Sequence, residues 1–243
     1  MTTSNKADTQ TGADAPARPS RASLARLDSE PRPTRMSRAS LDGDAPARPS
    51  KAAMGRGVGD KREAIMSAAL DLFVERGFFG TAVPEIAERA GVGAGTIYRY
   101  FDSKEALVNA LYRQEKLHWA RVVFDDFPAA ASPREQFRML WTRMVKFVTS
   151  NEKSFVFLEL HHHARYLDAE SRAVEQRTID LSVQLIHAAQ ARGDLKSGSP
   201  RLLIGIAMGS FIGVIRSCRD IEHPLDQADW KLAEQCVWEA IRS

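Results

Sequence analysis

Apolar residues from position 60 onward recur with the spacing of an α-helix. The first set falls at positions i, i+4, i+7 and i+8 and comprises Ile65, Ala69, Leu72 and Phe73. Asp60 and Glu63 have the spacing of a capping box at the start of this helix, and Gly77 is typical of a helix end. The pattern predicts a first helix over about residues 60–76.

Capping residues and apolar periodicity predict further helices along the rest of the chain. We expect them at 83–90, ending at Gly91; at 94–101; from Asp102 or Ser103 to about 125; at 132–150; from Asn151; at 168–193; at 199–219; and from Asp226 onward. No stretch alternates apolar and polar residues between hairpin turns. The sequence therefore predicts an all-α body of about nine helices.

Residues 1–59 differ from the rest of the chain in composition. They hold two copies each of DAPARPS and SRASL, and every aromatic residue lies at Phe73 or beyond. Their formal charge is +4, whereas the remainder carries −1. Because this segment has too little apolar surface to offset the entropy lost on ordering, we predict a disordered Pro/Arg-rich arm. The arm is either a basic tether for phosphates, a phosphorylated segment at Ser23 and Ser40, or a dispensable extension.

Residues 83–104 have the spacing of a helix-turn-helix unit. Ala87 lets two helices approach closely, Gly91 can adopt the left-handed conformation at the turn, and Val92 and Ile97 fill the wedge between the helices. Such a unit presents its second helix to the DNA major groove. The exposed positions of that helix are predicted to be Ala94, Gly95, Thr96, Tyr98 and Tyr100.

The chain from Asp60 to about Trp119 resembles the DNA-binding domain of the TetR/AcrR family of bacterial transcriptional regulators. The matching residues are Ala69–Phe73, Gly77-Phe78, Ile86–Val92, Thr96–Phe101, Lys104 and Leu107. The resemblance implies base-edge contacts by Ala94, Gly95 and Thr96. The phosphate contacts that it implies come from Tyr98, Tyr100, Lys104 and Thr81.

Two residues depart from the family's pattern. Pro84 stands where many relatives have a polar or basic residue, and Ala94 stands where Lys is frequent. We therefore expect the operator to be read with fewer direct base contacts.

By the same resemblance the chain has three parts. They are the arm at 1–59, a DNA-binding domain at 60–119 with its helix-turn-helix motif at 83–102, and a ligand-binding and dimerisation domain at 120–243. The implied function is that of a ligand-responsive repressor. It would bind a palindromic double-stranded DNA operator as a homodimer and be released by a small hydrophobic effector.

Candidate effector-binding residues lie on the predicted helices around residues 132–160. A broad apolar surface is formed by Phe137, Trp141, Met144, Phe147 and Phe155, which either line an adaptable pocket or form ordinary core. Polar candidates for orienting an effector are Glu159, His162 and Tyr166. Glu159 with His162 or His163 also has the spacing of half a carboxylate-bridged metal site.

Three glycines mark a candidate dimer interface. Gly205, Gly209 and Gly213 recur every four residues, and each costs about 1 kcal/mol of helix propensity relative to Ala. The stripe indicates close approach of another helix, either within the subunit or across a dimer. Trp230 and Trp238 are candidate interface aromatics, with packing inside the subunit as the alternative.

Other classes of protein find little support in the sequence. It holds no G-x-S-x-G, P-loop, H-E-x-x-H or C-x-x-C motif, so we expect no enzyme activity, no cofactor and no bound metal. We predict Cys218 and Cys236 to be buried apolar side chains, with a redox sensor as the alternative. The two cysteines, with no apolar secretory segment in the first twenty residues, predict a cytoplasmic setting. The longest apolar run, Leu202–Ile215, is shorter than the ~20 residues of a membrane span, which predicts a soluble protein. The alternative functions are a helical metal-binding enzyme and a non-specific architectural DNA binder.

Overall fold

The computed structural model describes residues 58–161, 163, 165–220 and 225–243. The arm predicted at 1–59 lies outside these residues, apart from its last two. Across the described part of the chain the regular elements are helical. The helices are α2 (Val58–Arg76), α3 (Val83–Ala90), α4 (Ala94–Ile97), α5 (Lys104–Phe124), α6 (Pro133–Ser150), α7 (Glu152–Phe155), the π-helix η1 (Val156–Leu160), α8 (Ala169–Ala191), α9 (Pro200–Asp220) and α10 (Gln227–Ile241). The all-α prediction is confirmed.

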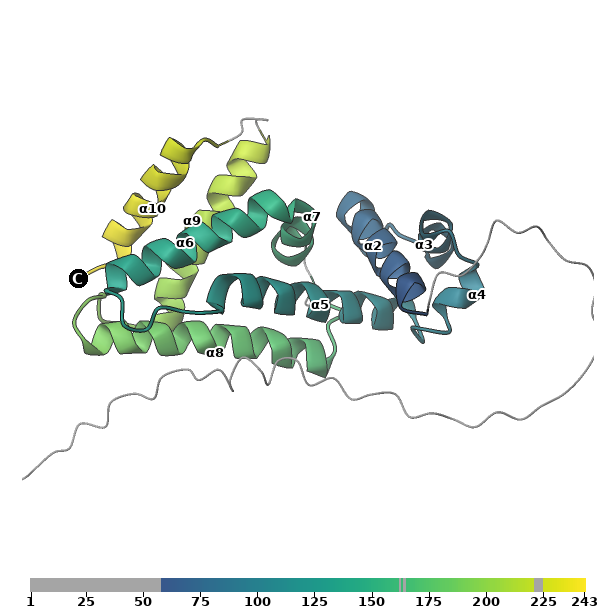
Figure 1. Cartoon of the computed structure of the whole chain (residues 1–243), viewed down its shortest axis with the longest axis horizontal. Helices are drawn as coiled ribbons and strands as arrows, with labels where there is room; N and C mark the ends of the chain where they lie inside the picture. Colours follow the sequence, from purple (N-terminus) through teal and green to yellow (C-terminus); the bar gives the residue numbers. More distant parts are fainter. Residues whose placement is uncertain (1–57, 162, 164, 221–224) are drawn as a thin grey trace, which may run out of the picture.

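Helices α2, α3 and α4 gather at one end of the molecule, and α6 to α10 form a larger body at the other (Figure 1). The long helix α5 runs from the first group into the second, with α8 alongside it. Its 21 residues correspond to a rise of about 30 Å. This helix therefore belongs to both parts and crosses the boundary predicted at residues 119 and 120.

Most of the predicted helix starts have the expected caps. The Ser103 and Asp168 side chains accept hydrogen bonds from the Ala106 and Ser171 N–H groups, at 3.1 and 2.7 Å. Ser132 and Asp226 start α6 and α10 with capping boxes. These local signals placed the helix starts correctly because each cap satisfies backbone donors within its own turn.

Three predicted elements differ from the structure. Asp60 lies inside the first turn of α2 instead of preceding the helix. The α-helical part of the predicted helix at 94–101 ends at Ile97, and tighter turns continue to Phe101. The helix expected from Asn151 consists of one α-helical turn followed by the π-helix η1, which the sequence pattern did not indicate.

Aromatic rings link the two parts of the molecule through a continuous core. Phe73 on α2 stacks on Phe157 of η1 with ring centroids 6.3 Å apart. Within the larger body, Phe211 on α9 lies edge-on to Trp141 on α6 at 5.1 Å and contacts Trp230 on α10 at 5.5 Å. The end of the molecule formed by α2, α3 and α4 is thus packed against the larger body instead of being tethered loosely to it.

Candidate nucleic-acid interface and effector cavity

The α3–α4 pair has the geometry of a helix-turn-helix unit. Gly91 ends α3 in the left-handed conformation (φ 66°, ψ 36°), and the Val92 N–H donates to the Ala87 carbonyl at 2.9 Å. The Ile86, Ala87 and Ile97 side chains are buried beneath the pair. The sequence predicted these roles for Gly91, Ala87 and Ile97, and the backbone and burial agree.

Most of the predicted recognition residues lie on the outer side of α4. Ala94, Gly95 and Tyr98 are exposed, and the Tyr98 side chain is the most prominent of them at 54%. Thr96 and Tyr100 are half-buried. A Cβ atom added at Gly95 would meet no atom within 4 Å, so the α4 backbone is open to close approach by a partner.

Thr81 is turned away from any DNA partner, so its predicted phosphate contact through the side chain is wrong. The residue is 2% exposed. Its hydroxyl lies 2.9 Å from the Gly77 carbonyl and 3.2 Å from the Leu72 carbonyl. The Thr81 hydroxyl therefore joins the segment before α3 to the end of α2.

Lys104 holds the turn between α2 and α3. Its Nζ donates to the Phe78 and Thr81 carbonyls at 2.8 and 2.9 Å and lies 4.2 Å from the centroid of the Phe78 ring. Two of the three ammonium hydrogens are thereby used inside the protein, which leaves one for the phosphate contact that the resemblance implied.

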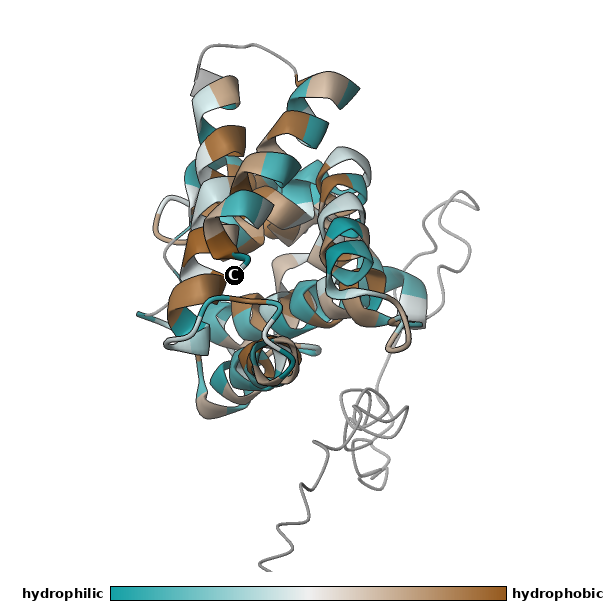
Figure 2. Ribbon diagram, turned by 90° about the vertical axis from the view of Figure 1, so that its left-hand side faces the viewer, coloured by the Kyte–Doolittle hydropathy of each residue, from teal (hydrophilic) through white to brown (hydrophobic). Residues whose placement is uncertain are grey.

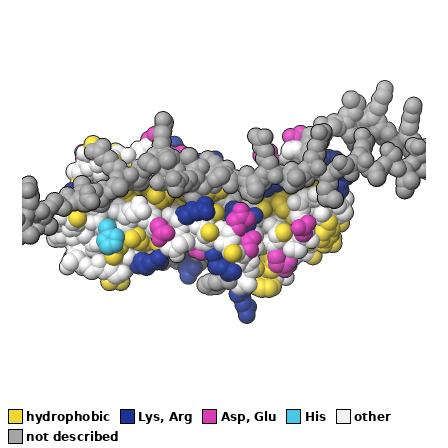
Figure 3. All heavy atoms as spheres, turned by 90° about the horizontal axis from the view of Figure 1, so that it is seen from below, with side chains coloured by type: hydrophobic (Ala, Val, Ile, Leu, Met, Phe, Trp, Pro, Cys, Tyr) yellow, Lys and Arg dark blue, Asp and Glu magenta, His cyan; other side chains and the backbone are white. Residues whose placement is uncertain are grey.

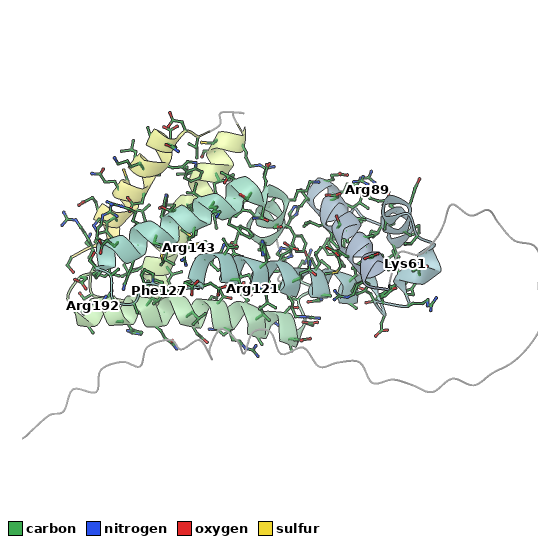
Figure 4. All side chains as sticks on the ribbon, in the orientation of Figure 1. Lys61, Arg89, Arg121, Phe127, Arg143 and Arg192 are labelled. Carbon is green, nitrogen blue, oxygen red and sulfur yellow. The ribbon has the colours of Figure 1, made fainter. Side chains whose placement is uncertain are left out.

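Two cations near this surface were not among the predicted contacts. Arg99 follows α4 between the two tyrosines. Lys61, which is labelled in Figure 4, lies in the first half of α2. Both are exposed, and neither has an ion pair with another residue that the structure describes. The position of Arg99 between Tyr98 and Tyr100, both predicted to contact phosphate, was the signal that could have identified it as a further phosphate contact.

Ion pairs between α2 and α3 fix the platform under α4. Arg76 contacts Glu85 at 2.6 Å, and Arg89 contacts Glu75 at 2.9 Å. The Arg89 hydrogen bond lowers the pKa of Glu75, and the Ala82 N–H, followed by Arg76, lowers the pKa of Glu85. Both carboxylates are therefore neutralised by partners on the neighbouring helix.

A cavity of about 140 Å³ lies in the larger body among α5, α6, α8, α9 and α10. Its lining is almost entirely apolar and includes Trp119, Val123, Phe124, Phe127, Phe137, Leu140, Trp141, Met144, Leu185, Ile186, Leu203, Ala207, Met208 and Trp238. Gln136 contributes an amide group to the lining and Ser182 a hydroxyl group. Phe127 comes from the loop between α5 and α6 (Figure 4). Three predicted effector residues, Phe137, Trp141 and Met144, are thus brought together at one cavity.

Of the other predicted effector residues, those that the structure describes do not line this cavity. Phe147 and Phe155 are fully buried in the core beside other aromatic rings. Glu159 forms an ion pair with Lys116 at 3.3 Å, and neither residue lines the cavity. His162 lies outside the described residues. Helical periodicity could not separate Phe147 from the three cavity residues of α6, because all of them follow the same apolar stripe of that helix.

Tyr166 belongs to the junction between the two parts of the molecule. Its ring stacks on Phe78 with centroids 4.4 Å apart, and its hydroxyl donates to His163 Nδ1 at 2.7 Å. His163 Nε2 donates to the Phe157 carbonyl, which fixes the neutral tautomer because a carbonyl can only accept. Burial lowers the pKa of His163 to about 4 and raises the pKa of Tyr166 to about 12. Both ring nitrogens of His163 are therefore engaged in holding the junction.

Asn109 joins α5 to the same junction. Its Nδ2 donates to the Tyr166 carbonyl at 2.8 Å, and its Oδ1 accepts from the Asp168 N–H at 2.8 Å. Asn109 is 2% exposed. A movement of α5 consequently changes contacts to the segment that stacks on Phe78.

The glycine stripe of α9 is open within the subunit. Gly205, Gly209 and Gly213 are exposed, and no described atom lies within 4 Å of the Cβ that each lacks. Leu202 on α9 and Leu232 on α10 are 62% and 63% exposed. The two helices joined by the grey trace at the top of Figure 2 are α9 and α10, and both carry strongly apolar segments. Among the described residues, nothing in the subunit accounts for the stripe.

The two tryptophans predicted at the interface pack inside the subunit. The Trp230 ring contacts Phe211, and its carbonyl accepts from Trp141 Nε1 at 3.2 Å. Trp238 contacts Phe137 at 5.5 Å and lines the cavity. These contacts agree with the alternative prediction of packing inside the subunit. Cys236 is exposed and Cys218 half-buried, so the prediction of buried cysteines is wrong.

Helix α9 is apolar enough, over Pro200–Arg219, to cross a membrane by length and composition alone. Its mean hydropathy there is 1.5, and 17% of the window is buried in the subunit. The 14-residue apolar run seen in the sequence is therefore extended by small and polar residues within one helix.

The face of the molecule seen in Figure 3 carries cations and anions interspersed where it is not covered by grey atoms.

A helix-turn-helix pair with an exposed second helix, set on a larger helical body, defines a DNA-binding regulator. The family model described as "Tetracyclin repressor-like, C-terminal domain" matches residues 115–243, and that described as "Bacterial regulatory proteins, tetR family" matches residues 65–111. The chain belongs to the TetR family of transcriptional regulators.

Individual relatives match over part of their length. The chain is 42% identical over 85 residues to the HTH-type transcriptional regulator RutR of Escherichia coli K12, a match that covers 34% of this chain and 40% of RutR. It is 32% identical over 123 residues to the HTH-type transcriptional repressor KstR2 of Mycobacterium tuberculosis H37Rv, covering 49% and 56%. A TetR family regulator from Shewanella sp. PV-4 superposes with a TM-score of 0.66 at 25% identity, over 75% of this chain and 98% of that one.

The junction makes folding stability depend on pH through His163. The unfolded imidazole takes up a proton near pH 6.5 and the folded one near pH 4, so stability is full above pH 6.5 and falls as the pH drops toward 4. We expect His163 to lower the free energy of unfolding, measured by chemical denaturation, by about 2 kcal/mol between pH 7 and pH 5. His163→Gln should remove most of that difference. His118→Gln, a change of a half-buried histidine on α5, should retain it, and equal pH dependence in all three proteins would contradict the assignment.

Proposed function

We propose that the protein is a ligand-responsive transcriptional repressor that binds a palindromic operator as a homodimer. The observation that carries the proposal is the exposed outer side of α4 on a buried α3–α4 platform, in a chain of the TetR family. One α3–α4 pair would enter the major groove at each half-site. Ala94, Gly95 and Thr96 would approach base edges, while Tyr98, Tyr100 and Arg99 would contact phosphates.

The open face of α9 supports dimerisation. A glycine stripe costs helix propensity, and a close helix contact compensates for that cost. In each subunit the stripe and the exposed Leu202 and Leu232 side chains lie on α9 and α10, so a second copy could cover them by forming a four-helix bundle. The same contact would bury the exposed apolar residues of α9.

Helix α5 supports coupling between effector and operator. Its first residue, Lys104, holds the Phe78–Thr81 turn, whereas Trp119, Val123 and Phe124 near its other end line the cavity. A ligand that shifts the cavity end of α5 would shift the turn from which α3 begins. A coupling free energy of about 1–3 kcal/mol would change operator affinity about 5- to 150-fold. Operator binding would repress transcription, the role that the name of KstR2 states for that relative, and release by the ligand would relieve the repression.

Selection of random double-stranded DNA on the purified protein tests operator recognition. We expect enrichment of one inverted repeat. Tyr98→Phe removes only a hydroxyl that would contact phosphate, so it should weaken binding of that repeat about fivefold, or about 1 kcal/mol. Enrichment of no sequence by the wild-type protein would contradict the proposal and favour a non-specific DNA binder.

The salt dependence of operator binding tests the added phosphate contact. Arg99→Ala should lower the slope of log affinity against log salt by about 1.8 for the dimer, because one counterion fewer is released at each of the two half-sites. Arg177→Ala removes the same charge from an exposed position on α8 and should leave the slope unchanged. Equal slopes for the two variants would remove Arg99 from the interface.

A charge placed in the glycine stripe tests the dimer. Gly209→Glu should convert a two-chain species into single chains, because a carboxylate would be buried between helices, and operator affinity should fall at least tenfold. Ser67→Glu adds the same charge at an exposed position of α2 and should leave the mass unchanged. Sedimentation equilibrium measures both, and a two-chain Gly209→Glu protein would place the interface elsewhere.

A further inference from the structure

The chemistry of the cavity restricts the class of ligand that it can hold. None of the residues lining it is Lys, Arg, His, Asp or Glu. A carboxylate or phosphate buried there would lose its hydration without gaining a partner of opposite charge, which is strongly unfavourable. The ligand that fits this lining carries no charge.

Gln136 has its donors committed to the protein. Its Nε2 lies 3.1 Å from the Pro128 carbonyl, 3.3 Å from that of Ala129 and 3.1 Å from that of Ala131, all in the loop between α5 and α6. Carbonyl oxygens only accept, so this contact fixes the orientation of the amide. The hydrogen-bonding capacity left to Gln136 is the acceptor Oε1.

Ser182 also has its donor committed to the protein. Its hydroxyl donates to the Thr178 carbonyl one turn earlier on α8 at 3.2 Å, which leaves the oxygen as an acceptor. The indole N–H of Trp141 donates to the Trp230 carbonyl. The neutral N–H groups of Trp119 and Trp238 have no hydrogen bond to another described group that would compete with a ligand. A hydroxyl group on the ligand matches this set, since it both donates and accepts.

The dimensions of the cavity indicate a single ring. Its volume of about 140 Å³ is close to that of the ~150 Å³ apolar cavity, known from another protein, that stays dry and binds benzene. Rings of Phe124, Phe137 and Trp141 form its walls, and Met144 and Met208 can adapt to short substituents.

We propose that the effector is an uncharged, one-ring hydroxy compound, such as a short alkylphenol, whose ring lies among these aromatic walls and whose hydroxyl donates to Gln136 or Ser182. This inference rests on the proposed function in taking the cavity as the effector site. It goes beyond that function by naming the ligand's size, charge and polar group.

Calorimetric titration of the full chain at pH 7 with three matched probes tests the ligand class. The probes are 4-ethylphenol, ethylbenzene and 4-ethylbenzoate. We expect 4-ethylphenol to bind most tightly, ethylbenzene about fivefold more weakly for want of the hydroxyl, and 4-ethylbenzoate at least a hundredfold more weakly. Benzoate binding as tight as that of the phenol, or no binding of the phenol at millimolar concentration, would overturn the proposal.

Variants locate the binding in the cavity. Ala207→Phe fills the cavity and should abolish 4-ethylphenol binding, whereas Ala169→Phe, at the exposed start of α8, should not. Gln136→Met and Ser182→Ala each remove one acceptor, and at least one of them should reduce the advantage of 4-ethylphenol over ethylbenzene to about one while ethylbenzene still binds. Undiminished binding to Ala207→Phe, or an unchanged advantage in both acceptor variants, would overturn the assignment.

Operator binding separates this inference from the function on which it rests. If 4-ethylphenol binds the cavity but leaves operator affinity unchanged, the ligand class stands and the coupling in the proposed function fails. If the protein selects an inverted repeat but binds none of the probes, the regulator stands and the ligand class is wrong.

Discussion

The structure depends on one helix being shared by two sites. At its start, Lys104 uses two ammonium hydrogens to hold the turn between α2 and α3, and near its end Trp119 and Phe124 line the cavity. Between these points Asn109 is buried and fully engaged with the segment around Tyr166. Because an α-helix is stiff over about 30 Å, the two ends cannot move independently. The DNA-binding platform and the cavity wall are therefore mechanically one element.

Buried polar groups make the junction specific where apolar packing alone would tolerate sliding. The Tyr166 hydroxyl, the His163 ring and the Phe157 carbonyl form a chain of hydrogen bonds, and each link would leave an unpaired buried group if the segments shifted. The cavity has the opposite character. Its aromatic and methionine walls have few directional contacts, so they can adapt to a ligand while the junction keeps its arrangement.

Features set within one helical turn could be predicted from the sequence, and features set by distant residues could not. Ser103, Ser132 and Gly91 act on their own helices, so spacing was sufficient to place them. Lys104 has its partners more than twenty residues away, and no local pattern indicated that its ammonium group is turned inward. Trp230 and Trp238 were equally ambiguous, because an apolar stripe has the same period whether it faces its own subunit or another.

Amide hydrogen exchange with and without operator DNA tests the shared helix most directly. Coupling is reciprocal, so a change that DNA causes at α3 and α4 must also appear at the cavity. With the inverted repeat recovered by selection, the account predicts altered exchange in α3 and α4 and also around Trp119–Phe124 and the cavity wall of α6. Altered exchange confined to the residues before Lys104, with none at the cavity end of α5, would contradict the account.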